Sequence, residues 1–109
     1  MVINNQIRSI LAECHLSHLL AKYGLEVELD WDVSISISEM QRLNFARLFF
    51  AHPIFCLADE CTSALGMQLE SMLYVKCAKD YKITMISVAH RPTVRHLFFC
   101  VLIFIRILI

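Results

Sequence analysis

Two short apolar runs with a helical segment between them constrain the fold of this 109-residue chain more than any other feature. The first run, "IFCLA", spans residues 54–58, and the second, "ITMISVA", spans residues 83–89. Residues 66–82 between them place apolar side chains at helical spacing. Strand, helix and strand in this order predict a right-handed βαβ unit in a parallel sheet. Because the first run is continuously apolar, we expect its strand to be buried on both faces.

The residues before the first strand are predicted to be mainly helical. Apolar residues at steps of three and four over residues 6–23 predict one amphipathic helix that ends near Gly24. Ser36, followed three residues later by Glu39, forms the pattern of a capping box and predicts the start of a second helix. Pro53 cannot continue that helix, so we expect it to end just before.

Composition and charge exclude several classes of protein. The chain is 58% hydrophobic, and its ten basic and ten acidic residues give a net charge of zero, which argues against nucleic acid as a partner. Five cysteines without a C-x-x-C pair indicate neither a disulfide framework nor a zinc site, and fit a reducing compartment. The N-terminus lacks the layout of a signal peptide. The apolar run at 97–109 is too short for an ordinary membrane-spanning helix.

Polar side chains stand where both predicted strands end. Asp59 and Glu60 follow the first strand, and His90 closes the second. Chemistry in parallel sheets gathers at the carboxyl ends of the strands, so these three groups are candidates for a site. Taken alone, an acidic pair is more often a solvated strand end, and a single histidine is more often a packing residue. The residue types by themselves do not decide between these structural interpretations and a functional site.

Four motifs in a fixed order narrow these alternatives. "ISISE" at 35–39 precedes "MQR", "IFCLADE" at 54–60 ends in the two carboxylates, "SALG" follows at 63–66, and "ISVAHRP" contains His90. Together they resemble the second half of an ABC-type ATPase domain, with its signature segment, Walker B strand, D-loop and switch histidine. From about residue 9 to residue 97, the chain looks like the subfamily D half-transporters of peroxisomes and lysosomes and related bacterial proteins.

The resemblance implies a role for each polar group at the ends of the strands. Asp59 would bind Mg²⁺ as the Walker B carboxylate. Glu60 would orient or deprotonate the water that attacks the γ-phosphate of ATP, and His90 would contact that phosphate and hold the geometry. An apolar strand that runs directly into two carboxylates has a chemical purpose under this interpretation.

The resemblance also implies residues that act in trans on nucleotide held by a partner. Ser36, Ser38 and Glu39 would lie at the helix N-terminus that faces the opposite subunit's ATP, a position that favours anions. The D-loop would consist of Ser63, Ala64 and Leu65. The implied partners are a second nucleotide-binding domain, in a homo- or heterodimer, and a transmembrane domain.

Some positions depart from the family pattern. The sequence contains no G-x-x-x-x-G-K-[ST] phosphate loop, the Walker A motif that cradles ATP phosphates. Ser38 stands where the family signature has glycine, and Gly66 stands where the D-loop has aspartate. We therefore expect an α/β fold that is a partial P-loop NTPase of the ABC type, with a parallel sheet and a helical subdomain, truncated before the Walker A region.

The expected organisation is a C-terminal part of a nucleotide-binding domain at residues 1–97 and a divergent apolar tail at 98–109. The expected function is ATP binding and hydrolysis that drives ABC-type transport, with ATP and Mg²⁺ as cofactors, at the cytosolic face of a peroxisomal or lysosomal membrane. The isolated chain is expected to be inactive because Walker A is absent. Two alternatives stay open: a catalytically dead fragment that acts as an interaction module, and a chromosome- or repair-type ATPase, which the zero net charge disfavours.

Overall fold

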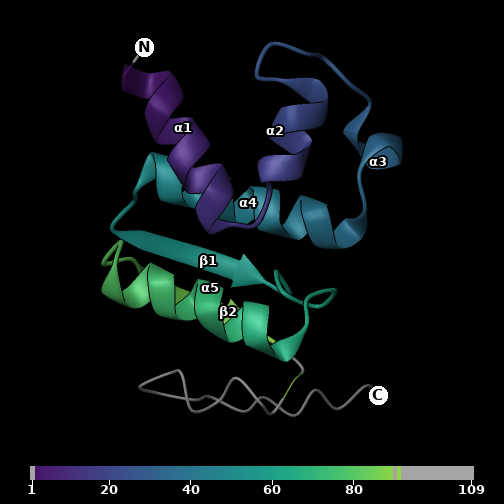
Figure 1. The fold of residues 1–109 in the computed structure, drawn as a ribbon. Coiled ribbons are helices and arrows are strands. Elements are labelled where there is room, and N and C mark those ends of the chain that lie inside the picture. Colours follow the sequence, from purple (N-terminus) through teal and green to yellow (C-terminus); the bar gives the residue numbers. More distant parts are fainter. Residues whose placement is uncertain (1, 90, 92–109) are drawn as a thin grey trace.

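A computed structural model describes residues 2–89 and 91 of the chain. The elements of this part follow one another as shown in Figure 1: α1 (Val2–Glu13), α2 (Ser17–Tyr23), α3 (Trp31–Ser34), α4 (Ile37–Ala51), β1 (Phe55–Asp59), α5 (Met67–Lys79) and β2 (Thr84–Val88). None of these helices is long and apolar enough to cross a membrane. The predictions for His90 and for the tail at 98–109 concern residues outside the described part.

The two strands form a parallel sheet connected by α5. Phe55 lies opposite Thr84, and Asp59 lies opposite Val88. A parallel pair needs a long crossover between its strands, and a helix is the usual one. The predicted strand–helix–strand unit with parallel strands is therefore confirmed, and the carboxyl ends of β1 and β2 meet at one edge.

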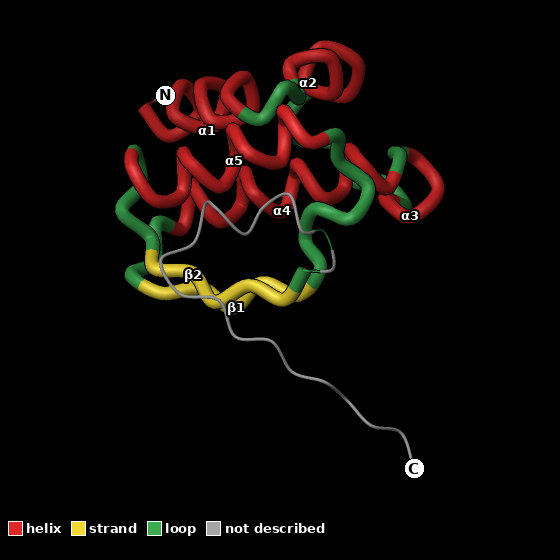
Figure 2. Tube along the Cα trace, turned by 90° about the horizontal axis from the view of Figure 1, so that it is seen from below, coloured by secondary structure: helices red, strands yellow, loops and turns green. Residues whose placement is uncertain are grey.

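The helices cover one face of this sheet and leave the other open (Figure 2). Ala58 on the covered face is 8% exposed, whereas Leu57 on the opposite face is 73% exposed. Ile86 pairs with Leu57 across the strands, and both Ile86 and Val88 are more than half exposed. The prediction that the first strand is buried on both faces is wrong for the described residues, because these supply helices for one face only.

The N-terminal segment forms two helices and not the single helix that its periodicity predicts. The chain turns at His15, whose backbone is left-handed with φ 57°. The amide of Leu16 donates to the carbonyl of Leu11, and the amide of His15 donates to that of Ala12. These two bonds close a helix as a Schellman motif. Cys14 and Leu16, on either side of the turn, are both fully buried, so the turn is stabilised by tertiary packing.

The other predicted helix boundaries are confirmed. Gly24, with φ 74°, is the C-cap of α2. Ser36 is the N-cap of α4 and forms a complete capping box with Glu39. α4 ends at His52, which takes a left-handed conformation immediately before Pro53.

Helix α4 contributes the largest side chains of the core. Phe49 stacks on Tyr81 with ring centroids 4.2 Å apart, and Phe45 meets Tyr74 of α5 edge-on at 6.0 Å. The other buried members of this core are Ile10, Cys14, Leu16, Ala46, Leu65, Leu73, Cys77 and Ile83.

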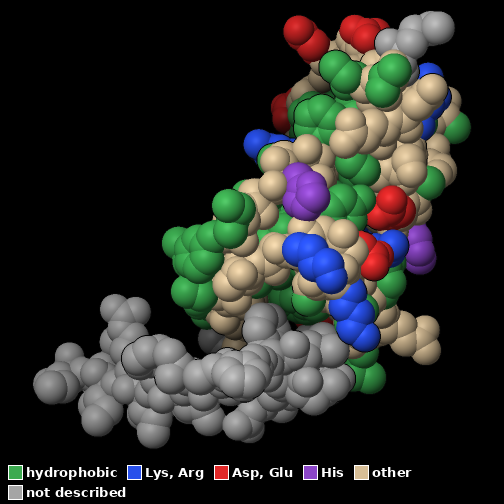
Figure 3. All heavy atoms as spheres, turned by 90° about the vertical axis from the view of Figure 1, so that its left-hand side faces the viewer, with side chains coloured by type: hydrophobic (Ala, Val, Ile, Leu, Met, Phe, Trp, Pro, Cys, Tyr) green, Lys and Arg blue, Asp and Glu red, His purple; other side chains and the backbone are tan. Residues whose placement is uncertain are grey.

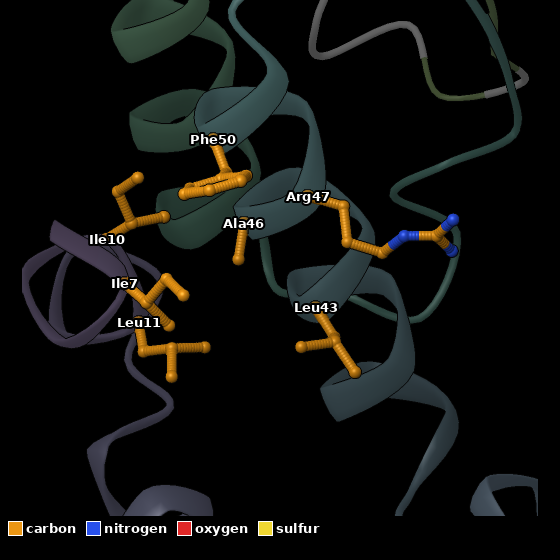
Figure 4. Close-up of a pocket in the computed structure, with 7 residues that line it drawn as sticks. All are labelled: Ile7, Ile10, Leu11, Leu43, Ala46, Arg47 and Phe50. Atoms are coloured by element: carbon orange, nitrogen blue, oxygen red, sulfur yellow. The ribbon is translucent and has the colours of Figure 1, made fainter. Parts of the chain in front are cut away.

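Between α1 and α4 lies an apolar groove of about 320 Å³ (Figure 4), which Ile7, Ile10, Leu11, Leu43, Ala46, Arg47 and Phe50 line.

The open sheet face generates a prediction about self-association. Leu57→Lys should reduce aggregation of the chain, because a lysine on an exposed strand opposes pairing with other chains. Its free energy of unfolding should change by no more than about 0.5 kcal/mol, as is usual for an exposed position. Sedimentation velocity and thermal melts of both proteins measure the two effects.

Ala58→Lys is the matched control for Leu57→Lys, since it places the same charge one residue further along, on the covered face. It should unfold the chain, because a buried unpaired charge is costly. Unfolding by Leu57→Lys would show instead that the outer face is covered in solution.

Candidate functional site

The acidic pair lies at the carboxyl end of β1, as predicted. Asp59 is the last residue of the strand, and Glu60 takes a left-handed backbone with φ 48°. Such a conformation is uncommon for a residue with a side chain. The Glu60 amide donates to the carbonyl of Val88, the last residue of β2, at 2.8 Å, so the ladder continues one residue past β1. Both carboxyl side chains are exposed and are therefore accessible to a ligand.

The loop after the acidic pair is ordered by buried residues and by short hydrogen bonds. Thr62 and Leu65 are both 2% exposed and anchor the loop in the core. The amide of Leu65 donates to the backbone carbonyl of Thr62 at 3.0 Å, and the amide of Ser63 donates to the backbone carbonyl of Glu60 at 3.4 Å. The structure thus places the predicted D-loop residues Ser63, Ala64 and Leu65 directly beside the acidic pair.

The predicted signature segment forms the N-terminus of α4. The Glu39 amide donates to Ser36 Oγ at 3.1 Å, and Glu39 Oε2 accepts from the Ser36 amide at 2.9 Å. Glu39 Oε1 lies 3.0 Å from Nε2 of His18 on α2. This contact with His18, followed by the Ser36 amide, lowers the pKa of the Glu39 carboxyl. Ser38 is half-buried, and its carbonyl accepts from Arg42 Nε at 3.4 Å.

The signature segment and the acidic pair lie at the same end of the molecule. α4 and β1 run in opposite directions in Figure 1, so the N-terminus of α4 is near the carboxyl end of β1. Gln41, in the first part of α4, bonds to both Ser63 and Ala64. His90 lies outside the described residues, but Ala89 and Arg91 on either side of it belong to the described part.

Burial makes the cysteine side chains of the described residues poor nucleophiles. Burial raises the pKa of Cys14 and of Cys77 to about 12. Burial also raises the pKa of Cys61, which stands next to the acidic pair. A cysteine reacts as its thiolate, so a raised pKa keeps these side chains unreactive at neutral pH.

The described surface carries mixed charge. On the face shown in Figure 3, lysine and arginine side chains lie among acidic and hydrophobic ones, and neither sign forms a continuous stripe. Within residues 2–89 and 91, no group of three His, Cys, Asp or Glu side chains is arranged to hold a metal ion.

Sequence reasoning missed three residues that organise the site: Gln41, Glu70 and Arg91. Glu70 is 1% exposed on α5 and lies 3.7 Å from Arg91 Nη1. Arg91 also donates to the carbonyls of Ser63 and Leu65. A usable signal was present for Glu70, because it lies three and seven residues before Leu73 and Cys77 on the apolar stripe of its helix. An acidic residue on such a stripe is rarely buried without a partner.

The fold and the site are compatible with part of an ABC-type ATPase domain. No protein-family model matches the chain. It is 40% identical over 92 residues to ATP-binding cassette sub-family D member 1 of Drosophila melanogaster, which covers 84% of the chain and 12% of that protein. It is 48% identical over 82 residues to the lysosomal cobalamin transporter ABCD4 of Mus musculus, covering 72% of the chain and 13% of that protein.

A third relative comes from a plant. ABC transporter D family member 1 of Arabidopsis thaliana is 36% identical over 93 residues, or 84% of the chain and 7% of that protein. The chain is therefore a relative of the ABC transporters of subfamily D. It spans only about a tenth of the length of the curated relatives that it matches.

The lowered pKa of Glu39 predicts how the start of α4 responds to acid. A carboxyl whose pKa in the folded state lies below its ordinary value of 4.5 stabilises the fold above that value. The contribution is lost as the pH falls through the lowered pKa. Glu39→Gln keeps the capping-box pattern but cannot ionise, so it should be less stable than the parent near neutral pH. The difference between their melting temperatures should shrink below about pH 4.5. A difference in melting temperature that stays constant with pH would show that the ionised Glu39 carboxylate does not stabilise the fold.

Gly66 predicts a stabilising substitution at the D-loop. It is the N-cap of α5, its backbone is extended with φ −68°, and a Cβ built there meets no atom within 4 Å. Gly66→Asp should raise the free energy of unfolding by about 0.5 kcal/mol, because aspartate is a better N-cap than glycine. Denaturant titration measures the change.

Gly24→Ala is the control for Gly66→Asp. Its φ of 74° suits glycine, so the alanine should destabilise by roughly 1 kcal/mol. If Gly66→Asp also destabilises, the N-cap position is more crowded than the structure shows.

Proposed function

We propose that this chain supplies one side of the ATP-hydrolysing site of a subfamily D ABC transporter. The observation that carries the proposal is the edge where β1 and β2 end. Asp59, Glu60 and the loop at 63–65 lie together there, and Arg91, which follows β2, donates to the loop. The homology to ABC transporters supports the transport context. In these terms the chain carries the signature, Walker B, D-loop and H-loop motifs.

Each proposed role follows from the chemistry of a side chain. Glu60 acts as the base or orienting group for the attacking water, for which its exposure and its place after a rigid strand are suited. His90 holds the γ-phosphate in place. Ser36 presents its hydroxyl and the amides of a 15-residue helix to nucleotide bound by the partner. The Ser36 Oγ accepts the Glu39 amide and still has its own proton to donate. Ser38 and Glu39 complete this surface.

The residues present fit a magnesium ion that is bound mainly by phosphate. Mg²⁺ in nucleotide sites takes one or two carboxylates together with phosphate oxygens and water, and needs no cage made of protein alone. Asp59, an exposed carboxylate at the end of the first of two paired strands, is a suitable ligand. The ion would neutralise charge on the phosphates of ATP.

The partners and the location follow from the family and are part of the proposal. A serine that acts in trans requires a second nucleotide-binding domain, and transport requires a transmembrane domain. We propose that the site lies at the cytosolic face of a peroxisomal or lysosomal membrane, which the lysosomal name of the mouse relative and the resemblance to peroxisomal half-transporters support. Residues 98–109 are proposed to be a tail that takes no part in the ATP site.

A second candidate function is an interaction module without catalysis. The observation that favours it is that Ser38 and Gly66 stand in place of two family residues. Such a chain would pair with a nucleotide-binding domain without turning over ATP. A chromosome- or repair-type ATPase has less support, because the net charge is zero.

A chimera separates these functions. Residues 9–97 replace the matching segment of a subfamily D transporter that carries its own phosphate loop, and ATP hydrolysis is measured. Activity should survive, and Glu60→Gln should lower it by about 10²- to 10⁴-fold while ATP binding persists, because glutamine cannot accept the proton. Glu26→Gln, at an exposed position before α3, is the matched control and should have no effect.

The isolated chain serves as the blank in this experiment. A chimera that binds ATP but hydrolyses none would favour the interaction module. Turnover that is unchanged by Glu60→Gln would remove Glu60 from the mechanism.

A further inference from the structure

The loop at 63–65 is held from one side by α4. Gln41 Nε2 donates to Ser63 Oγ at 2.8 Å, and Gln41 Oε1 accepts from the Ala64 amide at 2.9 Å. One side-chain amide thus uses both of its ends on two consecutive loop residues. A contact of this kind fixes orientation as well as distance, since both bonds must be satisfied together.

The same loop is held from the other side by Arg91, which follows β2. Arg91 Nη2 donates to the carbonyl of Ser63 at 2.8 Å, and Nη1 donates to that of Leu65. The planar guanidinium can present several donors in fixed directions, so it also constrains two loop residues at once. Ser63 is the point where the contacts from α4 and from Arg91 meet.

A buried carboxylate keeps Arg91 in this place. Glu70 on α5 is 1% exposed, and its Oε1 accepts no hydrogen bond within the described residues. The guanidinium of Arg91 lies 3.7 Å away and is the cation paired with it. A carboxylate so deeply buried is costly without a cation. The pairing therefore favours the position of Arg91 from which it reaches both loop carbonyls.

We propose that Gln41 and Arg91 are positioning residues that join α4, the loop at 63–65 and the end of β2 into one rigid unit. α4, the loop at 63–65 and Arg91 then move together. Any consequence for catalysis rests on the function proposed above, whereas the mechanical link itself does not. Glu70 acts through Arg91, and none of the three residues needs to touch nucleotide.

Amide hydrogen exchange of the full chain, without nucleotide, tests the link. Arg91→Met and Gln41→Met remove the contacts while keeping side chains of similar length. Each should accelerate exchange at Ala64 and Leu65 by about fivefold or more, the loss expected for one net hydrogen bond. Exchange in the middle of α1 should stay unchanged. Gln68→Met and Arg8→Met, at exposed positions, are matched controls and should leave exchange at Ala64 and Leu65 unchanged.

A spectroscopic signature distinguishes a link from two separate contacts. Arg91→Met should shift the side-chain amide resonances of Gln41, which it does not touch, because both residues bind Ser63. Arg91→Lys keeps a charge beside Glu70 but lacks the planar fork, so it should give intermediate exchange. Unchanged loop exchange in Arg91→Met, or unshifted Gln41 resonances, would overturn the proposal. So would a lysine variant that matches the parent.

Arg91→Met removes the cation beside a buried carboxylate and can therefore fail to fold. If Arg91→Met does not fold, the lysine variant and Gln41→Met decide the question in the same way. A chimera without ATPase activity would contradict the proposed function but not the link between α4, the loop and Arg91. Unchanged exchange rates at Ala64 and Leu65 in the variants would contradict the link but not the proposed function.

Discussion

The parallel pairing of β1 with β2 is the constraint on which the rest of this structure depends. Parallel strands cannot be joined by a tight turn, so the chain must cross over through α5 and return along the same face. The pairing brings Asp59 opposite Val88 and extends to the bond from the Glu60 amide. The loop at 63–65 is placed by this geometry, since it is the start of the crossover.

The one-sided cover of the sheet accounts for the unusual surface of the chain. Strands rich in apolar residues are normally packed on both faces in α/β folds, yet Leu57 and Ile86 stand open to solvent. The chain corresponds to about a tenth of each matched transporter. Within the described residues, this apolar face of the sheet is therefore uncovered.

Two ion pairs of this fold fix a helix end and a loop. Glu39 ties the start of α4 to α2 through His18, and Glu70 retains Arg91 beneath the loop. The first pair is accessible to water and contributes modestly. The second is buried on the carboxylate side, so the loss of either partner leaves an uncompensated charge. A few polar contacts therefore stiffen the site at the end of the sheet, in addition to the buried side chains of Thr62 and Leu65.

The sequence by itself determined the elements whose signals are local. The capping box of Ser36, the stop at Pro53 and the apolar strand that ends in two carboxylates each depend on neighbours a few residues apart. The order of these motifs was also enough to indicate the family. Local signals are readable because they arise from backbone hydrogen bonds and side-chain spacing within one segment.

Only the tertiary structure decided the remaining features. The turn at His15 exists because Cys14 and Leu16 both find buried positions, and the open sheet face reflects which helices are present to cover it. Gln41, Glu70 and Arg91 come together from α4, α5 and the segment after β2. Contacts between residues more than 20 positions apart leave no periodic trace in the chain, so packing alone reveals them.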